Sequence, residues 1–211
     1  MSILIEKLWM EKKEFVSAKE LKEYCKALKM DHESVIHYFI KRKHLVRIFR
    51  GIFYVKSLEE FKLGKSKYNH LELVSKGLEL KGVKNWYFGL HSALKLNNMT
   101  HEYFAVEEVI SDSLFRAKPI SIAGYKFRFV KISPSLLDFG IKKDSSAMLR
   151  YSDPEKTVLD LIYLSRQDGI PVDRIVMDIS DWSKNISKDK LKKYSKNYPK
   201  TIVEVVERLI R

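Results

Sequence analysis

Residues 31–43 carry the polar side chains whose spacing is most suggestive of a binding surface. At about 100° per residue, one side of a helix here holds hydrogen-bonding and cationic residues: Ser34, His37, Tyr38, Lys41 and, near its edge, Arg42. The opposite side holds the apolar residues Val35, Ile36, Phe39 and Ile40. A recognition helix in a major groove needs this division, because it presents polar groups to base edges while apolar residues anchor it from behind.

A basic β-hairpin is predicted directly after this helix. Residues 45–55, LVRIFRGIFYV, place β-branched and aromatic residues on both sides of Arg50-Gly51. Gly51 tolerates the positive φ of a tight turn, so two strands can fold back on each other there. Arg47 and Arg50 would then lie on or near the tip, where arginines can contact phosphates or enter the minor groove.

The polar helix and the basic hairpin need further elements to position them, and the sequence predicts that together they form a winged helix-turn-helix domain over residues 1–60. Ser17 and Glu20 form a capping box at the start of a helix, and its apolar stripe consists of Leu21, Tyr24, Cys25 and Leu28. Asp31 is the expected N-cap of the next helix. A first helix over residues 3–12 would complete the core, and residues 15–16 would form a short strand beside the hairpin.

A second domain is predicted over residues 68–211, after a short helical linker that contains Gly64. Hydrophobic periodicity predicts helices at 68–81 and 90–96, strands at 103–109 and 147–151, and a hairpin of 119–122 with 125–132. Asp153, Pro154 and Glu155 should open a further helix, and three more are expected at 173–182, 188–195 and 199–211. The expected fold class is therefore α+β, with a mixed second domain whose C-terminal part is helical.

Charge is unevenly distributed along the 211 residues, whose formal net charge is +13. Residues 1–56 carry 13 Lys and Arg against 7 Asp and Glu, so the net positive charge per residue is more than twice as high there as in the remainder. A basic excess attracts nucleic acid and anionic membranes alike. The sequence has no apolar run of membrane-spanning length and no signal-peptide pattern, so we expect a cytoplasmic protein without a membrane partner.

The motifs of catalysis and metal binding are absent from the sequence. None of the six histidines pairs with another His or with Cys25 at metal-ligand spacing, and there is no phosphate-binding glycine loop or nucleophile elbow. Asp178 and Asp181 come nearest to a carboxylate pair, but surface capping is the favoured interpretation. His91 and Ser92 are interpreted as packing residues. We therefore expect no enzyme, no metal and no cofactor.

Residues 184–200 hold seven lysines and one acid, Asp189. A solvated helix face is the favoured interpretation of this segment. A second phosphate-contacting patch is the alternative that stays open.

Three segments together match the pattern of one known family. LVRIFRGIFYV has the form of a Gly-hydrophobic-Tyr hairpin, and residues 86–100, WYFGLHSALKLNNMT, look like a "Ser-Ala-Leu…Gly-Leu-Thr" helix. Residues 151–163, YSDPEKTVLDLIY, are similar to a "Pro-Glu-(Lys/Arg)-Thr-hydrophobic-Leu-Asp" helix. These segments resemble the AbiEi-type antitoxins, predicted transcriptional regulators of phage-defence loci, over about residues 15–165. The chain departs from the family pattern where Asn97-Asn98-Met99 replaces Gly-Leu before Thr100.

The resemblance implies a two-domain regulator. Its winged helix would bind an inverted repeat in duplex DNA at its own promoter, as two copies, and its second domain would neutralise a nucleotidyltransferase-like toxin. The chain lacks the Gly-Ser and Asp-x-Asp signatures of a nucleotidyltransferase, so it is not expected to be the toxin. Two alternatives remain open: a protein-interaction module without specific DNA binding, and an enzyme in residues 68–211 with an unfamiliar site.

Overall fold

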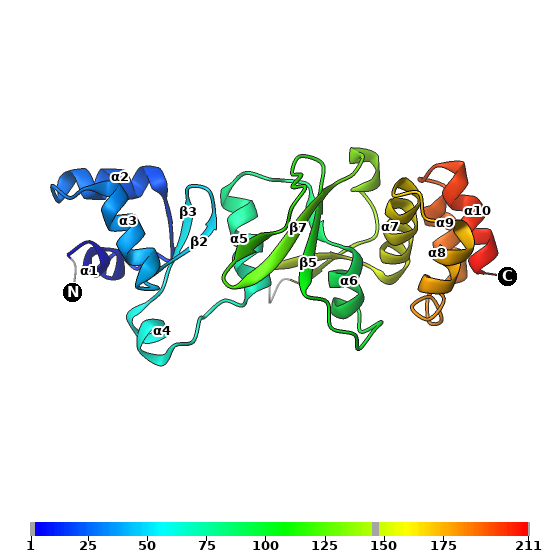
Figure 1. Cartoon of the computed structure of the whole chain (residues 1–211), viewed down its shortest axis with the longest axis horizontal. Helices are drawn as coiled ribbons and strands as arrows, with labels where there is room; N and C mark the ends of the chain where they lie inside the picture. Colours follow the sequence, from blue (N-terminus) through cyan, green and yellow to red (C-terminus); the bar gives the residue numbers. More distant parts are fainter. Residues whose placement is uncertain (1–2, 145–147, 211) are drawn as a thin grey trace. The chain divides into compact units, whose positions relative to one another are not determined.

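The structure is a computed structural model that describes residues 3–144 and 148–210. It is of the α+β class, with two β-sheets and helices before, between and after their strands, as Figure 1 shows. The chain divides into two compact units. Unit 1 runs to Lys84 and includes Ser121–Tyr125, and unit 2 contains Asn85–Ile120 and the residues from Lys126 onward.

Unit 1 begins with three helices and three strands. The order is α1 (Ile3–Met10), β1 (Phe15–Ser17), α2 (Ala18–Ala27), α3 (His32–Lys41), β2 (Leu45–Phe49) and β3 (Ile52–Val55). The strands form an antiparallel sheet in the order β1-β3-β2, with Phe15 opposite Tyr54 and Leu45 opposite Val55. One hydrophobic core joins these elements, and it includes Leu4, Leu8, Leu21, Cys25, Phe39 and Phe53.

Local capping explains where α2 and α3 begin. The Ser17 hydroxyl accepts a 3.1 Å hydrogen bond from the Glu20 backbone, and the Glu20 carboxylate accepts a 2.8 Å bond from the Ser17 backbone. Asp31 accepts a 2.9 Å bond from the Ser34 backbone at the start of α3. The capping box and the Asp31 cap are therefore confirmed. Gly51 has φ +78° at the turn between β2 and β3, as expected of a tight turn.

Two further helices follow the hairpin, α4 (Leu58–Leu63) and α5 (His70–Leu80). Gly64, with φ +66°, ends α4 within the expected linker. Helix α5 packs against β2 and β3 in unit 1, and Gly77 allows the close approach: a Cβ there would lie 2.6 Å from Ile48 Cγ2. Unit 1 therefore extends to Lys84, beyond the residue 60 expected from the sequence, and takes in the helix that was expected to open the second domain.

The second sheet has six strands in the order β6-β7-β5-β4-β9-β8. The strands are β4 (Trp86–Phe88), β5 (Val106–Ser111), β6 (Ile120–Ile122), β7 (Tyr125–Lys131), β8 (Ile141–Asp144) and β9 (Leu149–Ser152). β5 pairs in parallel with β7, and β4 in parallel with β9, whereas β4–β5 and β8–β9 are antiparallel. The sheet is therefore mixed.

Helices of unit 2 bury the apolar residues beside this sheet. They are α6 (Leu90–Leu96), the 3-10 turn η1 (Pro134–Leu136), α7 (Pro154–Gln167), α8 (Val172–Ile179), α9 (Lys188–Ser195) and α10 (Lys200–Leu209). Helix α7 packs against α6, α8, α9 and α10, so it is the central helix of the helical C-terminal part (Figure 1). In the described part of the chain, no helix is both long and apolar enough to cross a membrane.

Some expected elements of unit 2 differ in extent from the observed ones. The strand expected at 103–109 begins later, at Val106, and the helix expected at 173–182 ends at Ile179. The strand β8 was not predicted, because its sequence IKKD has one apolar residue and no alternation. Residue 147 of the strand expected at 147–151 and residue 211 of the last expected helix lie outside the described residues.

Candidate nucleic-acid interface

Helix α3 presents one polar face to solvent. Ser34, His37, Tyr38 and Lys41 are exposed, whereas Ile36 and Phe39 are buried in the core. Tyr38 keeps 50% of its surface exposed, so an aromatic ring is available for contact. Arg42 caps the end of α3, and its guanidinium lies 5.7 Å from the centre of the Tyr38 ring. The described geometry thus brings together the five residues expected to share this side of the helix.

The β2–β3 hairpin carries both expected arginines on its surface. Arg50 is exposed and immediately precedes the Gly51 turn, so it lies at the tip. Arg47 is also exposed but lies along β2 opposite Phe53, with its guanidinium 5.6 Å from that ring. The two cations are therefore presented by different parts of the hairpin.

The tip of the hairpin contacts the start of α2. The Ala18 backbone donates a 2.8 Å hydrogen bond to the Gly51 carbonyl, and Ser17 lies opposite Ile52 in the sheet. Lys19 and Lys22, which are exposed on α2, therefore lie within four residues of Ala18, the residue bonded to the hairpin. Sequence reasoning missed them, because only the tertiary contact places the start of α2 beside Arg50.

The His44 side chain packs at the junction between α3 and β2. Its ring stacks on Phe61 of α4 at 4.1 Å and lies 5.8 Å from Phe39 and 5.9 Å from Trp9. Burial, and then the nearby Arg42 charge, lowers the pKa of His44. The His44 ring therefore packs against α1, α3 and α4 at the point where the chain leaves α3.

His91 and Ser92 do not form a nucleophile–base pair. The buried Ser92 hydroxyl donates to Glu107 at 2.5 Å and accepts from the Glu108 backbone at 2.7 Å. His91 Nδ1 instead lies 2.9 Å from the Glu108 carboxylate, which also pairs with Arg128. Burial alone would raise the pKa of Glu108, but His91 and Arg128 hold it below its usual value. The Ser92 hydroxyl is therefore bonded to Glu107 and to the Glu108 backbone, and not to His91.

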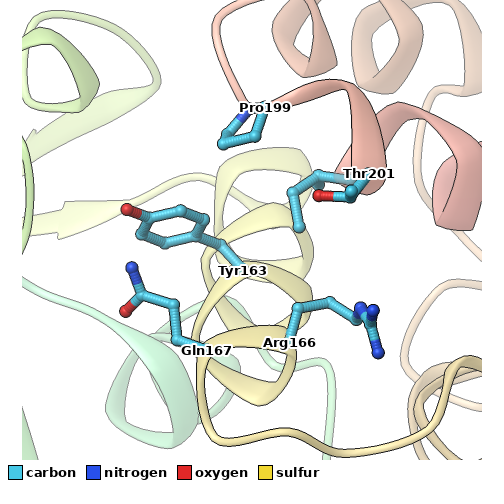
Figure 2. A pocket seen from close by; sticks show the side chains of 6 residues that line it. Tyr163, Arg166, Gln167, Pro199 and Thr201 are labelled. Carbon is cyan, nitrogen blue, oxygen red and sulfur yellow. The ribbon is translucent and has the colours of Figure 1, made fainter.

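A small recess of about 240 Å³ lies between α7 and α10 in unit 2 (Figure 2), lined by Tyr163, Arg166, Gln167, Pro199, Thr201 and Ile202. Figure 2 shows the Arg166 guanidinium pointing away from Tyr163 and Gln167, and its Nη1 donates to the Ile170 carbonyl at 2.9 Å. The lining contains no carboxylate and no histidine. It therefore lacks the acid–base groups that most hydrolytic sites use.

A larger recess of about 600 Å³ lies in unit 1 between α1 and α4. Of its three carboxylates, those of Glu14, Glu59 and Glu60, two have partners. Glu14 pairs with Lys67 and accepts a 2.7 Å bond from the Tyr68 hydroxyl, and Glu60 accepts from the Tyr54 hydroxyl and, at 2.8 Å, from the Ser57 backbone. These contacts fasten the linker to the sheet of unit 1.

Asp178 and Asp181, the nearest approach to a carboxylate pair in the sequence, do not form a joint site in the structure. Asp178 lies 3.0 Å from Arg174, and Asp181, beyond the end of α8, lies 2.7 Å from Lys184. Each carboxylate thus has a cation of its own at the surface. Across residues 3–144 and 148–210, no group of three His, Cys, Asp or Glu side chains could hold a metal ion.

The segment resembling the "Pro-Glu-Lys-Thr" helix builds a polar network in the core of unit 2. Lys156 and Asp160 are both fully buried, with Nζ 3.1 Å from the carboxylate. The hydroxyls of Tyr87 and Tyr198 donate to Asp160 at 2.8 and 2.7 Å. Sequence reasoning missed this network, although a lysine four residues before an aspartate inside an apolar helix was a usable signal.

The fold and these surfaces define an α+β protein of two units with an exposed polar helix and a basic hairpin in the first. The chain is similar to a solved structure described as the RV2827C protein from Mycobacterium tuberculosis, at a TM-score of 0.60 and 13% sequence identity. The match covers 98% of this chain and 74% of that one. At this identity the likeness concerns the fold alone. No protein-family model matches the chain, and no curated protein matches it in sequence.

Proposed function

We propose that the first six elements of unit 1 form a winged helix-turn-helix that binds duplex DNA, and that the protein is a transcriptional regulator. The observation that carries the proposal is the division of α3. Its exposed side holds Ser34, His37, Tyr38 and Lys41, and its buried side joins the core. The hairpin that follows exposes Arg47 and Arg50. A polar helix beside a basic hairpin has the parts that groove and backbone recognition require.

Each group in the proposed interface has a distinct role. Ser34, His37, Tyr38 and Lys41 contact base edges in the major groove, where hydrogen-bonding patterns distinguish all four base pairs. Arg42, Arg47 and Arg50 contact phosphates or the minor groove and set the orientation of the domain. The basic excess of residues 1–56 adds attraction to DNA that does not depend on sequence.

The resemblance to AbiEi-type antitoxins extends the proposal. On that basis the protein represses its own promoter through an inverted repeat and uses unit 2 to neutralise a nucleotidyltransferase-like toxin. It would act in the cytoplasm, as the lack of a signal-peptide pattern predicts. The network of Lys156 and Asp160 supports a structural role for the segment that carries the resemblance, because both side chains lie inside unit 2. The toxin would then contact the surface of the unit that this segment organises.

The test is a fluorescence-anisotropy titration of the full chain with its own upstream DNA and with a scrambled duplex, at several salt concentrations. A preference of about 10³-fold or more for the upstream DNA at physiological salt is expected of a specific regulator. Equal and steeply salt-dependent binding to both duplexes would contradict the proposal, because it would reflect the net positive charge alone.

A protein-interaction module is the second candidate. The observation that favours it is the exposure of two large aromatic side chains of unit 2, Tyr103 at 85% and Phe115 at 64%, since aromatic residues are enriched in the hot spots of protein interfaces. This candidate predicts weak DNA affinity that disappears at moderate salt. Gel filtration of the full chain mixed with a nucleotidyltransferase-like toxin would then yield a tight complex.

A further inference from the structure

We infer that four exposed lysines at the junction of α9 and α10 form a second phosphate-binding surface that contacts duplex DNA. These residues, the α9–α10 lysine patch, are Lys192, Lys193, Lys196 and Lys200. The inference rests on the DNA binding proposed for unit 1, and it gives unit 2 a part in the same complex.

Charge pairing separates the patch from the other lysines of residues 184–200. Lys184 pairs with Asp181, Lys190 lies 2.9 Å from both Asp153 and Glu155, and Lys188 donates to the Ile210 carbonyl at 3.0 Å. Within residues 3–144 and 148–210, none of the four patch lysines has a carboxylate within 4 Å. The seven lysines therefore divide into three that have a partner in the fold and four that have no carboxylate within 4 Å among the described residues.

The backbone that carries the patch is held rigidly. Leu191, Ser195 and Tyr198 alternate with the patch lysines and are buried, so the lysines must point outward. Tyr198 donates a 2.7 Å hydrogen bond to the buried Asp160, and Tyr194 a 3.2 Å bond to Asp153. Four cations within nine residues are thus presented from a fixed surface, which lowers the entropy cost of binding a polyanion.

Helix stability accounts for only part of the patch. Lys192, Lys193 and Lys196 lie at the C-terminal end of α9, where cations interact favourably with the helix dipole. Lys200 begins α10, whose first turn contains no acidic residue, so its charge opposes that dipole. The position of Lys200 is therefore unfavourable with respect to the α10 dipole, and a bound anion would compensate its charge.

The surroundings of the patch favour nucleic acid over an acidic protein. Between residues 178 and 210, all of them described, no large hydrophobic side chain is exposed; the nearest in sequence is Met177. Protein interfaces centre on aromatic or aliphatic anchors, and the patch offers none. An array of cations without such an anchor fits a phosphate backbone, whose binding depends on charge neutralisation.

The experiment compares three variants of the full chain with the wild type by anisotropy on the same fluorescein-labelled upstream duplex. The KCl concentration runs from about 50 to about 300 mM, about a sixfold change in salt. The patch variant carries Lys192→Gln, Lys193→Gln, Lys196→Gln and Lys200→Gln. The control carries the same charge change at four other exposed lysines of unit 2: Lys118, Lys126, Lys131 and Lys143. A third form replaces the patch lysines by arginine.

The slope of log affinity against log salt should become shallower by about 3 to 4 in the patch variant, because each paired phosphate contributes about 0.9. The control should keep the wild-type slope, and the arginine form should bind as the wild type does. An unchanged slope in the patch variant, or equal losses in patch variant and control, overturns the inference while the proposed function stands. A wild type that does not bind the duplex refutes the proposed function itself. Circular dichroism of each form verifies that the fold is retained.

Discussion

At the level of single residues, the exposed groups of unit 1 differ in what they can recognise. His37 projects from the polar face of α3, and Arg47 from the strand β2. An imidazole can read a base edge because it donates or accepts a hydrogen bond at a defined position, whereas a guanidinium at the backbone meets the same phosphate in every sequence. Substitution of His37 should therefore change the preference between DNA sequences, whereas substitution of Arg47 should change the affinity for all of them.

His37→Ala is expected to change the preference between DNA sites, at a cost of about 1–3 kcal/mol on the preferred site. The reason is that alanine removes a contact to one base pair and leaves the phosphate contacts in place. Competition binding with single-base variants of the site measures the effect. His101→Ala, at an exposed histidine of unit 2, is the control. Equal losses on specific and random DNA would count against the role of His37.

Arg47→Ala should weaken binding about equally on all sequences and flatten the salt dependence by about one unit of slope. The matched control is Arg116→Ala, at an exposed arginine of unit 2. Anisotropy at several salt concentrations measures both variants. Because Arg47 also lies over the Phe53 ring, thermal unfolding should verify that the hairpin remains folded. A slope equal to that of the wild type would sink the phosphate assignment.

At the level of elements, α7 organises unit 2 by two kinds of polar contact. Its inner side carries the buried Lys156 and Asp160, and its first turn carries Glu155, which joins α9. The Ser187 backbone donates a 2.9 Å hydrogen bond to Glu155, and Lys190 pairs with the same carboxylate. Helix α9, with the lysine patch at its end, is thus fastened to the start of α7.

Lys156→Met should destabilise the protein by about 3–5 kcal/mol, because the Asp160 carboxylate would remain buried without its cation. The double variant Lys156→Met/Asp160→Asn removes both charges and keeps an oxygen for the tyrosine hydroxyls, so it should lose less than the single variant. Urea unfolding measures both, with Lys193→Met as an exposed control. A single-variant loss below about 1 kcal/mol, the range of exposed ion pairs, would show that the pair is hydrated in solution.

Glu155→Gln should lower the free energy of unfolding by about 1–3 kcal/mol at neutral pH, the range for losing hydrogen bonds to a charged group. Burial raises the pKa of Glu155, but the Ser187 backbone and Lys190 outweigh it, so the pKa in the folded protein is lowered. A lowered pKa contributes stability that is present above the unfolded-state value and is lost as pH falls through the folded one.

The difference between wild type and Glu155→Gln should therefore be constant near neutral pH and shrink in acid, below the ordinary pKa of 4.5. Unfolding curves at pH 7, 5, 4 and 3 would measure this trend. A difference that stays constant over the whole range would exclude the ion pair as its cause.

At the level of the whole molecule, the proposed recognition of an inverted repeat requires two copies of the chain on one duplex. Light scattering coupled to gel filtration should find two chains per duplex for the full repeat and one chain for a half-site. Half-site centres about 10–10.5 base pairs apart, or a multiple of that, place both copies on the same side of the helix. One chain per full repeat at saturating protein would contradict this arrangement.

Structure set by neighbouring residues could be predicted from the sequence. The Ser17–Glu20 capping box, the Asp31 and Asp153 caps and the turn at Gly51 all rest on contacts within a few residues, and all are confirmed. The end of α6 is also local in origin. Asn98 takes φ +55° there, a conformation that asparagine tolerates better than most residues.

Other features depended on contacts between residues far apart in the chain. The packing of α5 against β2 at Gly77, the parallel pairing of β4 with β9, and the meeting of Tyr87 and Tyr198 at Asp160 all join distant segments.

The exposed character of Ser34, His37, Tyr38 and Lys41 followed from helical periodicity, because a helix fixes which residues share a face. Only the tertiary structure decided which lysines of residues 184–200 are paired. Charge pairing depends on where the fold brings a carboxylate. Lys190 of α9, for example, pairs with Asp153 and Glu155 at the start of α7.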